Sequence, residues 1–213
     1  MRIDPAGLPF IGGALALALV AGAAVAWLLA LPFLVVGAFF VFFFRDPDRA
    51  YAFDERDERD DIVLAPADGR VLVAGDAVAA AAPPGTWQQV SIFLSPVDVH
   101  VNRVPVSGTV TRVAYTPGRF LPAYRHDAAT TNERSEIWIE HRGQTIVARQ
   151  IVGILARRVV CRVAVGAQVQ AGDRFGIMKF GSRMDVFLPP SADVRVHVGD
   201  VVRGGETVIA VLH

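Results

Sequence analysis

The chain reads Val165-Gly-Ala-Gln-Val-Gln-Ala-Gly-Asp173 and, 33 residues later, Val198-Gly-Asp-Val-Val-Arg-Gly-Gly-Glu206. Both copies have the form V-G-x-x-V-x-x-G-acid, and both continue into strand-like segments, at 175–178 and 207–212. Glycine permits the tight turns that such a pattern needs, and the valines pack the flanking strands. The repeat therefore predicts two equivalent β-hairpins in the C-terminal part of the chain.

Outward from this repeat, the chain from residue 62 to the C-terminus has the pattern of a β domain. Short β-branched runs are separated by Gly, Pro and Asp, as at 62–64, 70–73, 90–94, 109–113, 137–139 and 146–151. Short strands at this spacing are typical of an all-β domain. Two hairpins that face each other build barrel-sandwich domains of the lipoyl and biotinyl type. We therefore expect residues 62–213 to form a mainly β barrel-sandwich domain that carries a Gly-Ser turn at Gly181-Ser182.

The N-terminal segment is apolar throughout. Residues 7–44 contain no charged residue, a run of 38 that a soluble domain of this size does not normally hold together. This predicts a helical membrane anchor over residues 1–46. As one helix the run would be about 57 Å long, against a hydrocarbon core of about 30 Å. The anchor is therefore either one tilted span with an interfacial extension, or two helices in a hairpin with a break near Pro32.

Charge limits the location and the partners of the protein. Arg45 and Arg49 follow the apolar run and only Arg2 precedes it, which predicts an inner-membrane protein whose C-terminal domain faces the cytoplasm. Residues 47–61 are densely charged and read as a solvated linker. The formal net charge of zero gives no support to a nucleic-acid partner. The single cysteine, Cys161, excludes an intramolecular disulfide.

The residues between the two repeat copies suggest a chemical role. The segment Lys179-Phe-Gly-Ser-Arg-Met-Asp185 joins a small residue, with an accessible carbonyl, to a hydroxyl that can attack it. In a strained turn the hydroxyl of Ser182 can attack the carbonyl of Gly181 and move the acyl group from nitrogen to oxygen. A base must take the hydroxyl proton, and donors must hold the tetrahedral oxyanion. Elimination and hydrolysis would then leave a pyruvoyl group at position 182.

Several motifs together resemble the short form of the phosphatidylserine decarboxylases. They occur in the order of that family and extend over nearly the whole chain. The matching segments are Phe43-Phe-Arg-Asp-Pro47, Ala65-Pro-Ala-Asp-Gly69, Leu94-Ser-Pro-Val-Asp-Val-His-Val-Asn-Arg103, Asn132-Glu-Arg134, Gly153-Ile-Leu-Ala-Arg-Arg158 and Phe180-Gly-Ser182. A Gly-Ser pair alone would be a weak signal, but the combination is highly specific.

This resemblance implies both an activity and a maturation step. The chain would cut itself between Gly181 and Ser182 into residues 1–181 and 182–213, which stay together as partners. The pyruvoyl group derived from Ser182 would then decarboxylate phosphatidylserine, a phospholipid substrate in the membrane, to phosphatidylethanolamine and CO2. The oligomeric state stays open, with a homo-oligomer as one option.

The resemblance also implies roles for individual residues. Ser182 is the pyruvoyl precursor, Asp68 matches the acidic residue of the Pro-Ala-Asp-Gly turn, and His100 matches the first histidine of the Ser-Pro-x-Asp-x-His segment. Long-form members have a second histidine three residues later, and here that position is Arg103. We assign the base to His100, with Asp68 or Asp98 to orient its ring, and leave open which of the three takes the proton of Ser182.

Arginine presents a fork that suits a phosphate or a carboxylate. A strong ion pair with the carboxylate that leaves as CO2 would stabilise the ground state, so a clamp on the phosphodiester is the better role. Arg103 or Arg134 is the candidate for that substrate-binding role. No Cys/His cluster has zinc spacing, so we expect no structural metal.

Two other interpretations fit parts of the sequence. Met178-Lys-Phe180 at a turn between hairpins resembles the lysine site of a biotinyl or lipoyl carrier domain, which would use Lys179. A membrane-anchored serine hydrolase would use Ser182 as its nucleophile, but the Gly-x-Ser-x-Gly elbow of such enzymes is absent.

Overall fold

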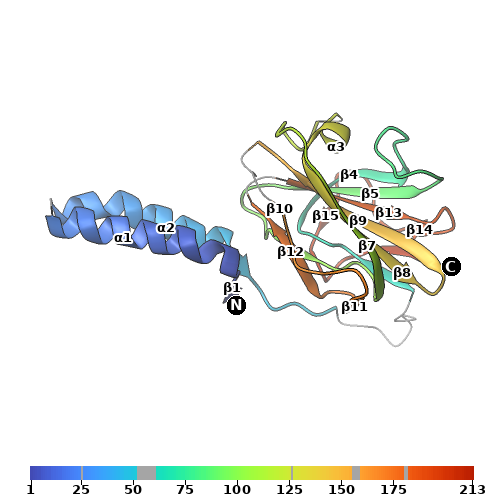
Figure 1. Cartoon of the computed structure of the whole chain (residues 1–213), viewed down its shortest axis with the longest axis horizontal. Helices are drawn as coiled ribbons and strands as arrows, with labels where there is room; N and C mark the ends of the chain where they lie inside the picture. The colour runs from blue at the N-terminus through green and yellow to red at the C-terminus, as the bar shows by residue number, and fades with distance from the viewer. Residues whose placement is uncertain (25, 52–60, 126, 155–158, 180–181) are drawn as a thin grey trace. The chain divides into compact units, whose positions relative to one another are not determined.

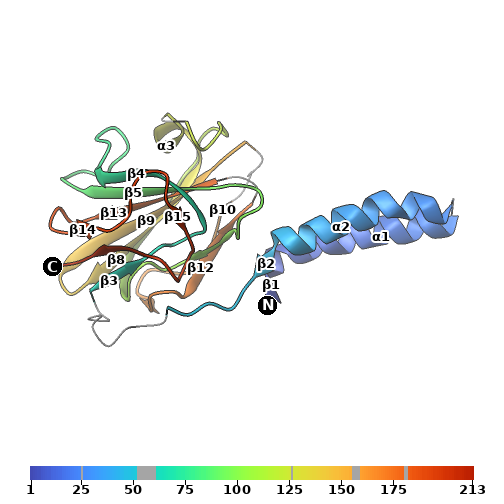
Figure 2. The same ribbon diagram turned by 180° about the vertical axis from the view of Figure 1, so that it is seen from behind.

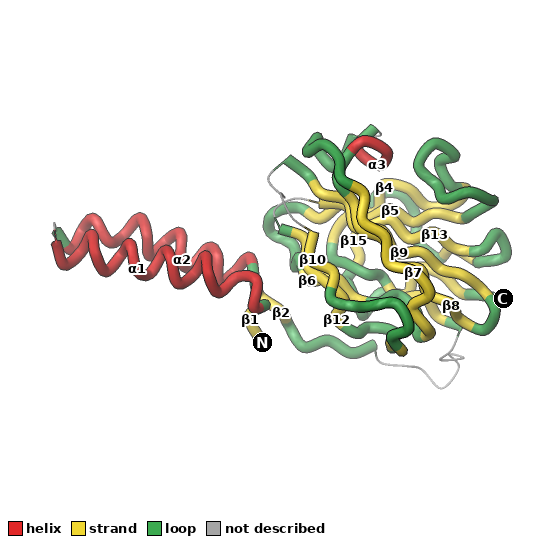
Figure 3. The backbone as a smooth tube through the Cα atoms, in the orientation of Figure 1, coloured by secondary structure: helices red, strands yellow, loops and turns green. Residues whose placement is uncertain are grey.

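The computed structural model describes residues 1–24, 26–51, 61–125, 127–154, 159–179 and 182–213. Contacts divide the chain into two units, Met1–Asp48 and Arg49–His213. The first unit is helical and the second consists almost wholly of strands (Figure 3).

The first unit is a pair of antiparallel helices, α1 (Leu8–Ala24) and α2 (Leu31–Phe43), which lie side by side in both ribbon views (Figures 1 and 2). Short 3-10 turns precede them, η1 (Pro5–Gly7) and η2 (Trp27–Ala30). Pro32 lies in the first turn of α2, where a missing N–H costs no helical hydrogen bond. Strands β1 (Arg2–Ile3) and β2 (Arg45–Asp46) pair antiparallel, and they hold the two ends of the helical pair together.

Small residues allow the two helices to pack closely. Ala14 and Ala18 are buried on α1, and a Cβ on Gly37 of α2 would lie 3.7 Å from the Cβ of Ala14. Close contact through small residues is typical of helices that associate in lipid. Most of the large apolar side chains point away from this contact and are exposed, among them Leu19 and Val35. The unit therefore offers an apolar outer surface.

The second unit is built around one curled, fully antiparallel sheet of eight strands in the order β11-β7-β8-β9-β13-β5-β4-β15. Two three-stranded sheets, β10-β12-β6 and β14-β16-β3, complete it. The strands of the large sheet are β4 (Gly69–Asp76), β5 (Gln88–Leu94), β7 (Gly108–Thr116), β8 (Arg134–His141), β9 (Gln144–Val152), β11 (Gln168–Val169), β13 (Ser182–Leu188) and β15 (Val201–Val202). Those of the small sheets are β3 (Ile62–Leu64), β6 (Val101–Arg103), β10 (Val159–Cys161), β12 (Arg174–Met178), β14 (Asp193–Val194) and β16 (Val208–Val211), and one short helix, α3 (Ala128–Thr131), follows β7. The prediction of a mainly β domain behind an apolar helical segment is confirmed.

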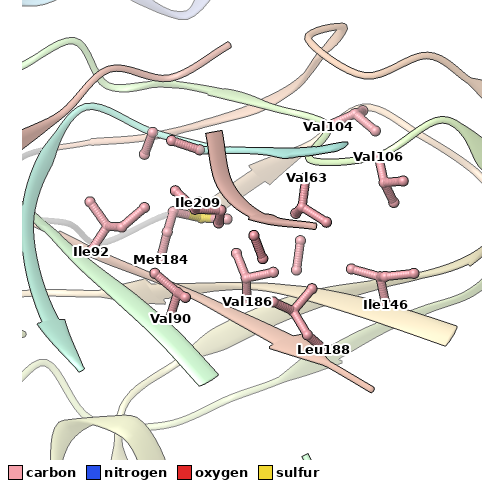
Figure 4. Close-up of a cluster of buried hydrophobic side chains, with 14 of the residues drawn as sticks. Val63, Val90, Ile92, Val104, Val106, Ile146, Met184, Val186, Leu188 and Ile209 are labelled. Carbon is pink, nitrogen blue, oxygen red and sulfur yellow. The ribbon is translucent and has the colours of Figure 1, made fainter. Parts of the chain in front are cut away.

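The hydrophobic core contains side chains from all three sheets. Val90, Ile92, Met184 and Val186 of the large sheet lie with Val63 of β3 in one buried cluster (Figure 4). Each of these side chains is fully buried. Along β13, Met184, Val186 and Leu188 face this core and alternate with Arg183, Asp185 and Phe187, which face the other side.

The repeat is present as two matching sets of hydrogen bonds, but the prediction that each copy is a β-hairpin is wrong. The strands on either side of each repeat turn pair with other strands, β11 with β7 and β12 with β6 and β10, and likewise β15 with β4 and β16 with β3 and β14. Val71 exchanges two backbone hydrogen bonds of 2.9 Å with the turn at 199–200. Val110 exchanges two, of 2.9 and 2.7 Å, with the equivalent turn at 166–167. The strands that follow these turns also match, because β15 pairs with β4 as β11 pairs with β7.

Positive backbone φ angles occur at the same places in both copies. Gly166 and Gly199 have φ of +86° and +100°, and Gly172 and Gly205 have +88° and +77°. Glycine adopts this region without the steric cost that other residues incur. The glycines that defined the sequence pattern are therefore required by the backbone that they form.

A second repeat becomes visible once the strands are paired. The segment Ala65-Pro-Ala-Asp-Gly-Arg-Val71 leads into β4, and Val104-Pro-Val-Ser-Gly-Thr-Val110 leads into β7. Asp68 and Ser107 hold the same place in these two segments. Each segment supports one copy of the first repeat through the hydrogen bonds of Val71 and Val110.

Candidate active site

Ser182 is the first residue of β13, in the middle of the large sheet. It pairs with Val152 of β9 on one side and with Leu94 of β5 on the other. Its side chain shares the inner face with Met184, since alternate residues of a strand point the same way. Ser182 is fully buried, and its Oγ has no hydrogen-bond partner among the residues that the structure describes. Gly181 lies outside the described residues, and with it the predicted scissile bond.

His100 comes to the same end of the domain as Ser182. It directly precedes β6, and its carbonyl accepts a 3.3 Å hydrogen bond from the N–H of Met178, at the end of β12. Only three residues separate Met178 from Ser182. His100 is fully buried, so its ring lies inside the domain rather than in solvent.

The ring of His100 is oriented by a backbone carbonyl. Its Nδ1 lies 2.9 Å from the carbonyl oxygen of Asp98. A carbonyl oxygen can only accept, so Nδ1 is the protonated nitrogen of the neutral ring and Nε2 holds the lone pair. This tautomer leaves Nε2 able to act as a base.

The carboxylate of Asp98 has a different partner. It accepts hydrogen bonds of 2.7 Å from both the N–H and the hydroxyl of Ser95, and the N–H of Asp98 returns a 3.0 Å bond to the carbonyl of Ser95. These bonds close the turn that places Asp98 and His100. Asp98 thus positions His100 through the backbone.

The carboxylate of Asp68 is held by an arginine and a backbone amide. Arg49 binds both oxygens, with 2.8 Å between Nη2 and Oδ2, and the N–H of Gly204 donates to Oδ1 at 2.9 Å. In the other half of the domain Ser107 does the same for the equivalent amide, since its hydroxyl accepts from the N–H of Ala171 at 3.0 Å. Asp68 therefore caps a repeat turn as Ser107 does, and in addition holds Arg49.

A pair of buried amides lies beside this end of the domain. Gln150 of β9 donates from Nε2 to Oδ1 of Asn102 on β6 at 2.8 Å, so the pair bridges two sheets. Both residues are fully buried. Nδ2 of Asn102 and Oε1 of Gln150 have no partner within the described part of the chain.

Sheet register places this amide pair next to Ser182 and His100. Gln150 pairs with Met184, so it is a diagonal neighbour of Ser182 on the same face, a spacing that a long side chain can reach across. Asn102 lies two residues after His100, so on extended chain their side chains point the same way. Of these four residues, Asn102 and Gln150 are in direct contact, and strand register places Ser182 and His100 in their vicinity.

The two arginines predicted to bind substrate, Arg103 and Arg134, do not belong to this group of polar residues but line two separate cavities. Arg103 is buried, donates to the carbonyl of Gly172 at 2.9 Å, and lines a cavity of about 250 Å³ together with Arg49 and Arg174. As the neighbour of Asn102 on one strand, it points to the other side of β6.

Arg134 is on β8 and pairs with Ile151, which pairs in turn with Arg183. It therefore shares the sheet face opposite to Ser182 and lines a cavity of about 310 Å³ with Glu136 and Arg149. Burial lowers the pKa of the Arg149 guanidinium, and the charge of Glu136, 2.8 Å away, opposes that shift.

Sequence reasoning missed three residues of these contacts. Asn102 lies two residues after His100, so strand alternation could have predicted that the two side chains point the same way. Gln150 is a polar residue in the apolar run 146–152, and a buried polar side chain usually has a partner. Arg49 could not be paired with Asp68 from the sequence, because nothing local joins them.

The buried polar groups at this end of the domain are the hydroxyl of Ser182, the imidazole of His100 and the amides of Asn102 and Gln150. The family model for phosphatidylserine decarboxylase matches residues 36–210. The chain belongs to the phosphatidylserine decarboxylase family and is an enzyme of the decarboxylase class.

Individual members of this family are similar in sequence to this chain over most of their length. A phosphatidylserine decarboxylase proenzyme of Nitrosomonas europaea is 43% identical over 208 residues, 97% of this chain and 94% of the relative. One of Pelodictyon phaeoclathratiforme is 46% identical over 172 residues, 81% and 78% of the two chains. One of Granulibacter bethesdensis is 43% identical over 215 residues, 97% and 84%. This membership argues against the carrier that would use Lys179 and against the serine hydrolase.

Proposed function

We propose that the chain decarboxylates phosphatidylserine to phosphatidylethanolamine and CO2 with a pyruvoyl group that it makes from Ser182 by cutting itself after Gly181. The observation that supports this most is the hydroxyl of Ser182, fully buried and without a partner in the described residues. An unpaired buried polar group is costly and calls for a functional reason. The relatives' name of proenzyme fits a chain that must be processed.

In the proposed maturation, Nε2 of His100 takes the proton of the Ser182 hydroxyl. The oxygen attacks the Gly181 carbonyl, the peptide C–N bond breaks and an ester forms. Loss of the Ser182 Cα proton then expels the Gly181 carboxylate, which keeps the former hydroxyl oxygen. Water replaces the nitrogen of the remaining aminoacrylyl residue, ammonia leaves, and a ketone stays at position 182.

The pyruvoyl group would supply an electron sink that accepts the electron pair left on the substrate α-carbon when CO2 departs, as pyridoxal phosphate does in other enzymes. Apolar side chains surround position 182. Leu94 and Val152, the two cross-strand neighbours of Ser182, are fully buried and keep water from the leaving carboxylate. His100, held by the Asp98 carbonyl, is the proposed donor of the proton that replaces CO2.

The phosphodiester of the substrate would bind an arginine. Arg103 is the first candidate, because its cavity also contains Arg49 and Arg174, and Arg134 is the second. Asp68 would act on this site indirectly by holding Arg49.

The helical pair is the proposed membrane anchor, with the catalytic domain on the cytoplasmic side of the inner membrane. The unit 1–48 contains the one helical stretch long and apolar enough to cross a bilayer in the described chain, Pro5–Ala23, and a shorter apolar one, Trp27–Phe43. Its exposed apolar side chains suit a lipid environment. The substrate headgroup then needs only to lift out of the interface.

We also assign the catalytic unit to the barrel-sandwich architecture. The support is its two matching halves, with equivalent turns bonded in the same way to Val71 and Val110. A solved structure with two such halves superimposed on a biotinyl domain would test this assignment.

The decisive test replaces Ser182 and follows the chain by intact mass spectrometry. Wild-type protein is expected as two pieces, the smaller being residues 182–213 with a carbonyl that reacts with hydrazine. Ser182→Ala is expected to stay a single, inactive chain, because it lacks the attacking oxygen. Ser91→Ala, a buried serine on the neighbouring strand that faces the opposite side, serves as the control and should still be cut. An uncut wild-type enzyme with full activity would refute the proposal.

A further inference from the structure

The amide pair Asn102–Gln150 has hydrogen-bonding capacity that its own bond does not use. In their mutual bond Nε2 of Gln150 donates to Oδ1 of Asn102, which leaves the amide nitrogen of Asn102 and the amide oxygen of Gln150 unpaired within the described residues. Exchange of nitrogen and oxygen in both amides would again leave one donor and one acceptor. A single water can satisfy both groups, since it donates and accepts at once.

The surrounding backbone is shaped around Gln150. A Cβ on Gly176 of β12 would lie 2.8 Å from Nε2 of Gln150 and 2.2 Å from the carbonyl oxygen of Val160. Nε2 of Gln150 also approaches that carbonyl at 3.5 Å. The absence of a side chain at Gly176 therefore makes room for the amide, which reaches from the large sheet into the small one.

Another buried glutamine shows what an ordinary structural role looks like here. Gln89 of β5 is also fully buried, but its Oε1 accepts from the N–H of Val78 at 3.0 Å and its Nε2 donates to Ser91 Oγ at 2.9 Å. Gln89 lies on the face of the sheet opposite to Ser182, because it alternates with Val90 and Ile92 of the core. Of these two glutamines, Gln150, which lies on the side of Ser182, is the one whose amide oxygen has no partner in the described residues.

We propose that Asn102 and Gln150 are positioning residues that hold the water that turns the cut residue 182 into its ketone. This rests on the proposed function, in which the hydroxyl oxygen of Ser182 leaves with Gly181 and the ketone oxygen must come from water. The water oxygen adds to the carbon that bears the nitrogen, the C–N bond breaks, and the nitrogen leaves as ammonia. Among apolar walls such as Leu94 and Val152, a water needs polar partners of this kind to be held.

The test compares two time courses in the full chain: cleavage on a denaturing gel and release of ammonia. In Gln150→Met, which keeps the shape but removes the amide, cleavage should stay near the wild-type rate while ammonia release lags about tenfold, the effect of one lost hydrogen bond on a barrier. Borohydride added during the lag should leave alanine at the start of the 182–213 piece, whereas the finished ketone gives a lactyl group. Gln89→Met is the matched control and should keep both time courses together.

A second variant covers the case in which Gln150→Met does not fold. Asn102→Asp replaces only the unpaired nitrogen and keeps an oxygen for Gln150, so it should show the same lag. If both time courses stay together in the folded variants, the amide pair has no such role and the inference is overturned. If wild-type protein itself yields no cut and no ammonia, the proposed function fails instead.

Discussion

At the level of single residues, the ring of His100 contacts the backbone carbonyl of Asp98, while the sequence suggested a carboxylate as its partner. The resemblance suggested that the carboxylate of Asp68 or Asp98 orients His100, and its Nδ1 lies 2.9 Å from the carbonyl oxygen of Asp98. The carboxylate of Asp98 binds Ser95, and that of Asp68 binds Arg49 and Gly204. Spacing alone could place Asp98 and His100 together, but it could not tell which oxygen faces the ring.

This difference leads to a prediction for Asp98. Asp98→Asn keeps an oxygen for Ser95 and keeps the carbonyl, so self-cleavage should stay within about threefold of wild type, whereas loss of a triad carboxylate costs about 10⁴-fold. His100→Ala should slow cleavage strongly, because it removes the proposed base. The cleavage rate of purified precursor, followed on gels, measures both. A collapse of the rate in Asp98→Asn would make its carboxylate a working part of the machinery.

At the level of secondary-structure elements, the parts with local signals were predictable and the rest were not. The repeat turns, the strand runs and the apolar helices follow from glycine positions, β-branched residues and uninterrupted hydropathy, all read within about ten residues. The pairing of β13 with β5 and β9 joins segments far apart in sequence, so the partners of Gln150 depend on which strands become neighbours. The second repeat, through Asp68 and Ser107, was also missed because only Pro, Gly and the final Val are identical in its two copies.

The equivalent glycines Gly172 and Gly205 offer a matched pair of variants. Both have positive φ, so alanine at either should cost about 1–2 kcal/mol of stability. A Cβ at Gly172 meets open space, but one at Gly205 would lie 2.7 Å from Cδ of Arg103. Gly205→Ala should therefore be less stable than Gly172→Ala and should also raise the KM for phosphatidylserine if Arg103 clamps the phosphodiester.

Urea unfolding and steady-state kinetics in mixed micelles measure these two effects. Equal stability and equal KM in the two variants would remove Arg103 from the substrate site. A higher KM in Gly205→Ala alone would favour Arg103 over Arg134.

At the level of the whole molecule, the proposed cut would not release the small piece. Residues 182–213 supply β13, which lies between β9 and β5 (Figure 1), together with β15 on β4 and β16 on β3. Many buried side chains of the core, such as Met184, Val186 and Ile209, belong to this piece.

We therefore predict that the two pieces of the processed enzyme elute together in size-exclusion chromatography in detergent and separate only in denaturant. Their contacts include two full ladders of sheet hydrogen bonds, so dissociation requires unfolding of the domain. Release of the 182–213 piece under native conditions would contradict the central position of β13.

The short ladder between β1 and β2 has a consequence for how the chain enters a bilayer. It brings residues 2–3 and 45–46 together, so both ends of the helical pair belong to one side. The bend between the helices, Trp27–Ala30, reads Trp-Leu-Leu-Ala and contains no group that needs water. The first apolar stretch, Pro5–Ala23, is long enough to cross the hydrocarbon layer, and the second, Trp27–Phe43, is shorter. A hairpin of this kind would insert with both of its ends at one interface, so residues 1–4 and 45–48 would lie on the same side of the membrane.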